Sequence, residues 1–471
     1  MNRREFGLLT VAGVASRFLR ANDATLYNEK YRPQFHFTPQ KGWTNDPNGL
    51  VFYKGEYHLF FQHNPFGTKW GNMTWGHAVS HDLVHWKQLA NAIEPDIRGT
   101  IFSGSAVVDD DNTARFQSGE EKTLVAIYAA AGGTSPESKG QPFTQCIAYS
   151  NDRGRTWTKY SGNPVVPHML GDNRDPKVVW HSPTKQWIMV LYLDGNTFRF
   201  MASPNLKNWT ILHDITVPGA AECPGFFEMP VEGERGPTKW VWTAANDNYV
   251  IGAFDGKRFI PEVMTQQGHH GQNYYAVQTY SGLPGARRVQ VAWMNGGEYP
   301  DMPFNQQMSF PYELKLRRFG LSLKLCALPV REIESLYETQ RSWNEVEVKP
   351  GDNPLAAFAG ELWDINAEIA PGSATDLGFR IRGRPVTYRV KEKRLSNGDA
   401  AADMSPEEDG RIRIRILVDR TSVEVFGNDG EVVIPCCFLP GETDRSLELF
   451  ALGGTARITS MSIYKLKSIW R

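Results

Sequence analysis

Short hydrophobic runs of β type follow one another from about Tyr31 to Leu325, and clusters of Gly, Pro, Asn and Asp separate them. The clearest runs are Leu50–Tyr53, Tyr57–Gln62, Thr123–Ala129, Trp187–Leu193, Lys239–Ala245 and Arg288–Met294. Apolar residues do not recur over any long stretch with the period of an amphipathic helix. The pattern therefore predicts a region built of many short β-strands.

A weak internal repeat orders these runs. Its units share a Ser, an Asp or Asn two residues later, and a Trp further on: Ser80-His81-Asp82 with Trp86, Ser150-Asn151-Asp152 with Trp157, and Ser203-Pro204-Asn205 with Trp209. Phe254-Asp255-Gly256 closes a similar strand–turn–strand unit. Units of roughly fifty residues with several strands are what the blades of a β-propeller require. A set of unrelated hairpins with Asx turns is the alternative.

A second region of alternating strands begins at about Trp343. Its clearest alternation spans Arg411–Phe426, and Asn428-Asp429-Gly430 is a strong hairpin signal. Between the two regions, the amphipathic stretch Pro329–Leu336 predicts a brief helix. We therefore expect an all-β chain with a β-propeller over residues 31–325, a linker with a short helix over 326–342, and a β-sandwich over 343–471.

The composition agrees with two folded domains. The 471 residues exceed one ordinary domain, and 41% hydrophobic residues are enough for real cores. A net charge of -1 without basic blocks gives no electrostatic signature of nucleic-acid or anionic-membrane binding. Aromatic residues make up 12%, which suits both large β cores and faces that stack on sugar rings. The adjacent Cys436 and Cys437 should point to opposite faces of a strand, so a disulfide between them is not expected.

The N-terminus has the features of an export signal. Arg3-Arg4 precedes an uncharged stretch from Gly7 to Ser16, which is too short to span a bilayer but suits the apolar part of a signal peptide. The paired arginines predict a twin-arginine signal over residues 1–24, and hence a periplasmic or extracellular protein. The alternative is a frayed cytoplasmic N-terminus, because Arg17 and Arg20 closely follow the apolar run.

Three carboxylates of the first region occur in unusual local sequences. Asp46 lies in Gly-Trp-Thr-Asn-Asp-Pro-Asn-Gly, Asp175 in Asn-Arg-Asp-Pro, and Glu222 in Ala-Glu-Cys-Pro-Gly. Each stands one or two positions before a Pro, which restricts the backbone and can fix the direction of the side chain. Taken singly, they suit an Asx turn, a surface ion pair and a solvated turn residue.

Together the three carboxylates indicate glycoside hydrolysis. That reaction needs one carboxyl group to protonate the leaving oxygen and another to attack the sugar or to activate water. Polar and aromatic segments typical of sugar sites accompany Asp46, namely Gln62–Pro65, Trp70–His77 and Phe102–Ser105. In a propeller, the blade loops and inner strands would bring such groups together at the mouth of a central funnel.

At these motifs the sequence resembles glycoside hydrolase family 32, the β-fructosidases that include invertases, levanases and inulinases. Trp43–Gly49 is similar to the Trp-Met-Asn-Asp-Pro-Asn-Gly signature of that family. The resemblance covers nearly the whole chain after the signal, and it includes Phe102–Ser105, Arg174–Pro176, Glu222–Pro224, Met308–Leu314, Val418–Phe426 and Leu466–Trp470.

The resemblance implies a five-bladed β-propeller followed by a β-sandwich, a retaining mechanism and no cofactor. It assigns Asp46 as the nucleophile, Glu222 as the general acid/base, and Asp175 as the stabiliser of the transition state. The residues that it implies around the terminal fructosyl unit are Trp43, Asn45, Gln62, Trp70, Phe102, Ser103, Arg174 and Trp293. A metal is not expected, because the clustered histidines have no Cys or carboxylate partners at ligand spacing.

The chain departs from the family pattern at three positions near these motifs. Thr44 stands where Met is frequent, Gly225 where Asp commonly follows Glu-Cys-Pro, and Tyr312 where Arg is usual. The three carboxylates are intact, so the departures leave the reaction class unchanged and put substrate preference and the rim of the pocket in question.

The leading hypothesis is an exported, exo-acting enzyme that releases terminal fructose from levan or inulin and also cleaves sucrose. A sucrose-specific invertase and a fructosyltransferase are alternatives within the same architecture, because acceptor choice depends on rim loops. A catalytically inactive carbohydrate-binding protein is a further alternative, which the intact carboxylates disfavour. The expected partner is an oligosaccharide or polysaccharide, and no nucleic acid or membrane span is expected.

Overall fold

The computed structural model describes residues 26–470, and this part of the chain is almost entirely β-structure. Its helical segments are two short 3-10 helices, η1 (Pro136–Ser138) and η2 (Arg331–Leu336), the second of which forms where the amphipathic stretch predicted a helix. No helix in the described part is long and apolar enough to cross a membrane. The twin-arginine segment lies outside the described residues.

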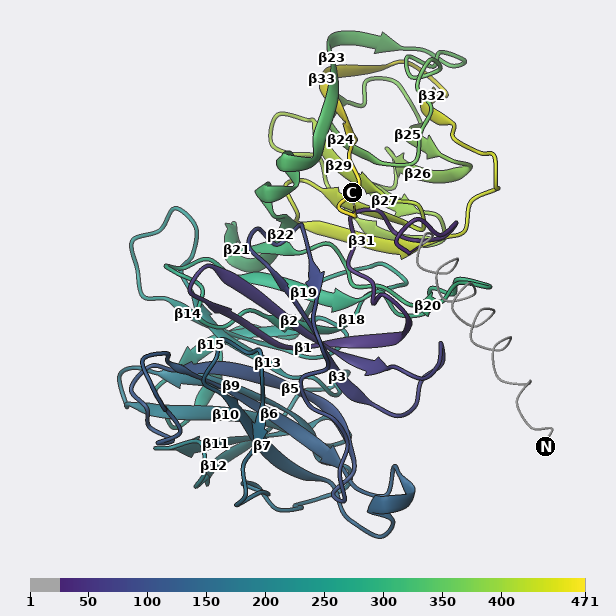
Figure 1. Ribbon diagram of the computed structural model, residues 1–471. Coiled ribbons are helices and arrows are strands. Elements are labelled where there is room, and N and C mark those ends of the chain that lie inside the picture. Colours follow the sequence, from purple (N-terminus) through teal and green to yellow (C-terminus); the bar gives the residue numbers. More distant parts are fainter. Residues whose placement is uncertain (1–25, 471) are drawn as a thin grey trace, which may run out of the picture.

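The N-terminal part of the chain folds as a five-bladed β-propeller, as predicted (Figure 1). The first blade consists of β1 (Gly42–Tyr53), β2 (Glu56–Asn64), β3 (Thr74–Ser80) and β4 (Lys87–Gln88), and the short β20 (Phe304–Asn305) pairs with β1. The second blade consists of β5 (Thr100–Asp109), β6 (Thr123–Ala131), β7 (Thr144–Ser150) and β8 (Thr158–Lys159). The third has β9 (Arg174–His181), β10 (Gln186–Asp194), β11 (Thr197–Ser203) and β12 (Thr210–Thr216). The fourth blade consists of β13 (Gly225–Met229), β14 (Lys239–Thr243), β15 (Asn248–Phe254), β16 (Phe259–Pro261) and β17 (Gln266–Gln267). The fifth blade consists of β18 (Tyr275–Thr279), β19 (Val289–Trp293), β21 (Tyr312–Phe319) and β22 (Ser322–Pro329).

The first strand of each blade lines the centre of the propeller. β1 contacts β5, β5 contacts β9, β9 contacts β13, β13 contacts β18, and β18 returns to β1, so the five strands close a ring. Each inner strand therefore begins at one end of a central channel and finishes at the other. Side chains at the beginnings of these strands meet at one mouth of the channel although they are far apart in sequence.

The repeat seen in the sequence is a turn at the end of the third strand in three successive blades. Ser80, Ser150 and Ser203 end β3, β7 and β11, and each hydroxyl donates to the Asp or Asn two residues later, at 3.0, 2.7 and 3.3 Å respectively. The same carboxylate or amide oxygen accepts backbone N–H groups further on, which is the bonding of an Asx turn. The repeat therefore marks blades, and the alternative of unrelated hairpins is wrong.

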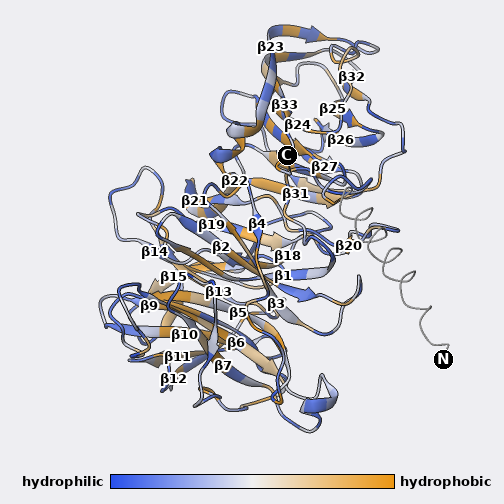
Figure 2. Cartoon of the chain, viewed as in Figure 1, coloured by the Kyte–Doolittle hydropathy of each residue, from blue (hydrophilic) through white to orange (hydrophobic). Residues whose placement is uncertain are grey.

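The C-terminal part of the chain is a β-sandwich of two antiparallel sheets. One sheet has the order β23 (Tyr337–Val348), β33 (Ala456–Leu466), β24 (Trp363–Ala370), β29 (Ile412–Val418), β30 (Ser422–Gly427) and β31 (Val432–Cys437). The other has β28 (Ala400–Asp403), β27 (Arg394–Asn397), β26 (Arg384–Arg389), β25 (Asp376–Ile381) and β32 (Leu447–Leu452). Hydrophobic residues concentrate on the strands and hydrophilic residues on the connecting loops (Figure 2). All five cysteines are free, as expected for Cys436 and Cys437.

The two domains share buried structure at their junction. One apolar cluster joins Phe35 and Tyr312 of the propeller part to Leu417 and Phe426 of the sandwich. The rings of Tyr312 and Phe426 meet edge to face at 5.0 Å between centroids. The sandwich is thus packed firmly against the last propeller blade (Figure 1).

Candidate active site

Asp46 stands on a β-bulge at the beginning of the inner strand of the first blade. In the pairing of β1 with β2, Thr44 lies opposite His63 and Pro47 opposite Phe61. Asn45 and Asp46 therefore both lie opposite the single residue Gln62, which is the arrangement of a bulge. Bulges redirect side chains, and this one accompanies the Pro that follows Asp46 in the sequence motif.

Two donors hold the carboxylate of Asp46. The hydroxyl of Ser103, near the beginning of β5, donates to Oδ2 at 2.5 Å, and Nδ2 of Asn45 donates to Oδ1 at 3.0 Å. Burial raises the pKa of Asp46, while these two hydrogen bonds lower it and the charge of Glu222 raises it further. The donors thus stabilise the ionised form, which is the form that can attack an electrophilic carbon.

Asp175 is the most deeply buried of the three carboxylates, at 4% exposure. Its Oδ2 accepts the backbone N–H of Cys223 at 3.0 Å. The Cys223 thiol lies 3.5 Å from this oxygen and 3.7 Å from Oδ2 of Asp46, so it bridges the two carboxylates. Burial raises the pKa of Asp175 to about 7; the charge of Arg174 opposes the rise, and the charges of Glu222 and Asp46 add to it.

Glu222 precedes β13, and 34% of its side chain is accessible to solvent, against 4% for Asp175. Nη2 of Arg174 donates to Oε1 at 2.9 Å, and the hydroxyl of Tyr275 donates to Oε2 at 3.3 Å. The backbone has positive φ at Asp175 (61°), Glu222 (53°) and Cys223 (38°), a conformation that side chains other than Gly adopt at a cost. Such strain is concentrated at functional sites in proteins, and here it accompanies both carboxylates.

The other residues expected around a sugar form a continuous set beside these carboxylates. Nε1 of Trp43 donates to Oδ1 of Asn45 at 2.9 Å, and the Trp43 ring meets Trp293 edge to face at 6.2 Å. Trp70, at 57% exposure, meets Phe102 edge to face at 6.0 Å, and Phe102 precedes Ser103 in β5. Nε2 of the buried Gln62 has no hydrogen-bond partner within residues 26–470. These aromatic faces and the free amide nitrogen of Gln62 are suited to a sugar ring.

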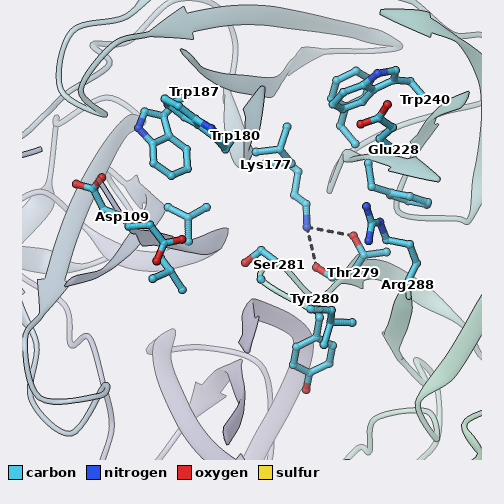
Figure 3. Close-up of a pocket in the computed structure, with 18 of the residues that line it drawn as sticks. Asp109, Lys177, Trp180, Trp187, Glu228, Trp240, Thr279, Tyr280, Ser281 and Arg288 are labelled. Carbon is cyan, nitrogen blue, oxygen red and sulfur yellow. Dashed lines mark hydrogen bonds between the residues drawn. The ribbon is translucent and has the colours of Figure 1, made fainter. Parts of the chain in front are cut away.

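A cavity of about 500 Å³, whose lining residues Figure 3 shows, lies toward the opposite end of the channel. Its lining includes Val107, Lys177, Phe227 and Thr279, which come later in the inner strands than the residues around the carboxylates. Lys177 points into the cavity and donates to the backbone oxygen of Thr279 at 2.8 Å. Burial, and then the charge of Arg288, lower the pKa of Lys177 to about 7. The three carboxylates do not line this cavity.

Sequence reasoning did not identify Tyr275, or the contact of Cys223 with two carboxylates. Tyr275 is an aromatic residue beside another Tyr, so nothing in its local sequence indicated chemistry. The departures Thr44 and Tyr312 are buried, and the Tyr312 hydroxyl contacts Glu424 of the sandwich. A Cβ on Gly225 would lie 2.1 Å from Oγ1 of Thr243, so glycine suits the packing there. All three departures therefore belong to the packed interior.

Comparisons with known proteins identify the family of the chain. The family model described as "Glycosyl hydrolases family 32 N-terminal domain" matches residues 36–327, and the corresponding C-terminal model matches residues 332–465. A levanase of Bacillus subtilis (strain 168) is 41% identical over 98% of this chain and 74% of that protein. An extracellular exo-inulinase of Aspergillus awamori is 31% identical over 94% of this chain and 96% of that protein.

The solved structures show the same architecture. The crystal structure of the exo-inulinase from Aspergillus awamori superposes with a TM-score of 0.86 and 30% identity, over 94% of this chain and 100% of that chain. A fructofuranosidase from Schwanniomyces occidentalis in complex with fructose superposes with a TM-score of 0.82 at 28% identity, over 94% of this chain and 99% of that chain. The chain belongs to glycoside hydrolase family 32 and is a glycosidase.

Proposed function

We propose that the protein is an exo-acting, retaining β-fructosidase that releases terminal fructose from levan and inulin and also cleaves sucrose. One observation carries the proposal: three carboxylates from three blades meet at one mouth of the channel, where Asp175 is buried and Asp46 and Glu222 are partly exposed. The fructosyl unit would occupy the closed interior, while the leaving sugar would lie on the open side beside Glu222. This arrangement favours attack at a chain end.

In the first step, an oxygen of Asp46 attacks the anomeric carbon and forms a fructosyl ester, while the bond to the leaving oxygen breaks and Glu222 protonates that oxygen. Fructose reacts at a tertiary anomeric carbon, so its transition state carries strong positive charge. Asp175, close to Asp46 through the bridging Cys223, would bind the sugar hydroxyls and stabilise this charge.

In the second step, Glu222 removes a proton from water, whose oxygen attacks the same carbon and releases Asp46. Two displacements on one carbon retain its configuration. Neither step calls for a cofactor or a metal, because the carboxylates supply the nucleophile, the acid and the base.

Export is part of the proposal. Levan and inulin are polymers that do not cross a membrane, so an enzyme that degrades them has to act outside the cell. The matched exo-inulinase of Aspergillus awamori is described as extracellular, and the Arg3-Arg4 segment has the features of a twin-arginine signal.

The test of the mechanism is Glu222→Gln with an activated fructoside, whose leaving group needs no proton. The first step should then proceed, while hydrolysis of the ester stays slow because an amide cannot act as the base. We expect a covalent hexosyl adduct on the peptide that contains Asp46, detected by mass spectrometry of the quenched digest.

The matched control is Glu228→Gln, on the strand β13 that Glu222 precedes, with its side chain lining the opposite cavity. This variant should turn over normally and accumulate no adduct. An adduct on Asp175 would exchange the roles of nucleophile and stabiliser, and rapid full turnover by Glu222→Gln would remove Glu222 from catalysis.

Product chromatography on sucrose, inulin and levan separates the remaining activities. Free fructose as the sole early product indicates exo-hydrolysis, and action on sucrose alone indicates an invertase. An excess of free glucose over fructose from sucrose indicates transfer, whereas no release from any of them would leave only a binding protein.

A further inference from the structure

We propose that Tyr275 positions Glu222 for its two proton transfers, and that the β-sandwich holds Tyr275 in place through the segment 270–273. The inference rests on the proposed role of Glu222 as general acid/base. Tyr275 is a positioning residue in this proposal, because it acts through Glu222 and needs no contact with the sugar.

The two oxygens of Glu222 have different partners. Oε1 accepts from Arg174, which also lies 3.8 Å from Asp175 and is expected to bind the fructosyl unit. Oε2 accepts from the Tyr275 hydroxyl. When a sugar occupies the pocket and binds Arg174, the hydrogen bond from Tyr275 to Glu222 remains. It would then fix the rotation of a side chain that is otherwise one third exposed.

The ring of Tyr275 is itself well fixed. It packs against a small buried cluster formed by Cys223, Ala245 and Ala276. It also meets the ring of Trp293 edge to face at 6.4 Å, on the strand that pairs with its own. Because Cys223 follows Glu222 directly, the same cluster holds both the tyrosine ring and the backbone beside the carboxylate.

The segment that leads into Tyr275 is docked on the sandwich. The backbone N–H of His270 donates to the carbonyl of Val433 at 2.8 Å, and the side-chain oxygen of Asn273 accepts the N–H of Cys437 at 2.7 Å. A Cβ on Gly271 would lie 2.0 Å from the carbonyl oxygen of Pro435, so the two chains are in close contact. Val433, Pro435 and Cys437 belong to β31, the edge strand of the sandwich sheet nearest the propeller (Figure 1).

This connection gives the sandwich a role in the reaction although it supplies no catalytic group. Asn273 is bonded to β31, and Tyr275, two residues later, is bonded to the acid/base. A shift of the edge strand would therefore be transmitted to Glu222 over a very short stretch of backbone. Small misplacements of a catalytic group reduce rates strongly.

The first test is Tyr275→Phe, which removes the hydroxyl and keeps the ring. We expect kcat on inulin to fall about tenfold with little change in KM, because proton transfer to the leaving oxygen weakens while binding persists. With fructosyl fluoride, whose leaving group needs no proton, the initial burst of fluoride should keep its parental rate. Tyr280→Phe is the matched control, because the buried Tyr280 hydroxyl makes no hydrogen bond within residues 26–470.

A second variant tests the connection to the sandwich. Asn273→Ala deletes the acceptor of the Cys437 N–H and leaves Tyr275 itself unchanged. It should give a weaker loss of the same kind, about threefold in kcat on inulin, with a normal fluoride burst. Parental kinetics in Asn273→Ala would overturn the part of the proposal that concerns the sandwich.

The outcomes are distinguishable from a failure of the proposed function. If Glu222→Gln loses turnover while Tyr275→Phe keeps its parental kcat, the positioning role is refuted and the acid/base role stands. An equal loss of the fluoride burst in Tyr275→Phe would also refute it, since a general disturbance of the pocket affects both substrates. If Glu222→Gln turns over normally, the proposed function fails first.

Discussion

The junction between the domains contains a buried charge cluster, and Glu424→Gln tests its contribution to stability. Nδ1 of His36 lies 2.8 Å from Asp419, and Nε2 lies 2.6 Å from Glu424, with all three side chains inaccessible to solvent. Asp419 also accepts the backbone N–H groups of Gln34 and Phe35. An imidazolium thus joins the N-terminal segment to two carboxylates of the sandwich.

The magnitude follows from the pKa of His36. Burial would lower this pKa, but the charge of Glu424 and the hydrogen bond with Asp419 outweigh burial and raise it from 6.5 to about 9. At 1.36 kcal/mol per pKa unit, the rise corresponds to about 3 kcal/mol of stability. That agrees with the roughly 3–5 kcal/mol lost when one partner of a buried ion pair is removed. Glu424→Gln should therefore lower the free energy of unfolding by about 2–3 kcal/mol at pH 6.

The pH dependence has a definite sign. The folded-state pKa of His36 is raised, so its contribution is fully present below about pH 6.5 and is lost as the pH rises through about 9. The difference between parent and Glu424→Gln should consequently shrink to less than about 1 kcal/mol at pH 10. The chemical step should remain nearly unchanged in the folded variant, because Glu424 lies outside the site.

The assay is urea denaturation followed by tryptophan fluorescence at pH 6 and pH 10, together with kcat on inulin. Glu448→Gln serves as the control, because Glu448 pairs with Arg380 at the surface, where an ion pair contributes about 0–1 kcal/mol. A difference for Glu424→Gln that is equal at both pH values would refute the reasoning. A loss of kcat as large as that of Asp46→Asn, with folding intact, would refute the placement of Glu424 outside catalysis.

Two further predictions concern the channel. Ser103→Ala removes a hydrogen-bond donor to the ionised form of Asp46, so the pKa of Asp46 should rise and the acidic limb of the pH profile of kcat/KM should move to higher pH. An acidic limb that does not move would contradict the assignment of Asp46 as the group that must be ionised. Lys177→Met removes an amine whose folded-state pKa is depressed to about 7, so the free energy of unfolding of the parent should rise between pH 7 and 10 relative to that of the variant. If urea denaturation gives the same change with pH for both proteins, the depressed pKa of Lys177 is refuted.

The strands and blades were predictable because their signals are local. Each of the six hydrophobic runs that the sequence pattern predicted as strands lies within an observed strand or closely matches one. The Ser–Asx repeat was predictable for the same reason, since each turn is closed by side chains two residues apart. The number of blades came only from the family resemblance.

The candidate carboxylates could be found from their motifs, but their surroundings could not. Tyr275 reaches Glu222 across 53 positions of sequence, and His36 reaches Glu424 across 388. Neither pair leaves a local pattern, because each contact exists only after blades and domains have packed. Tyr312 shows the same limit. Its departure from the family motif suggested a difference at the rim of the pocket, but its side chain lies in the interior against Tyr274, Phe426 and Glu424.

The topology of the propeller explains why the chemistry gathers at one end of the channel. Ser103, Asp175 and Tyr275 stand at or near the first residues of their inner strands, and Glu222 just precedes one. Asp175 lies at a register shift in the pairing of β9 with β10, and Glu222 lies in a bend before β13, and both places depart from regular strand geometry and allow a positive φ. The opposite mouth is lined by later residues of the inner strands and by loop residues such as Gly282 and Gly285, around Lys177. A fold that closes its inner strands into a ring therefore offers two mouths, and in this protein the strained carboxylates distinguish the one suited to catalysis.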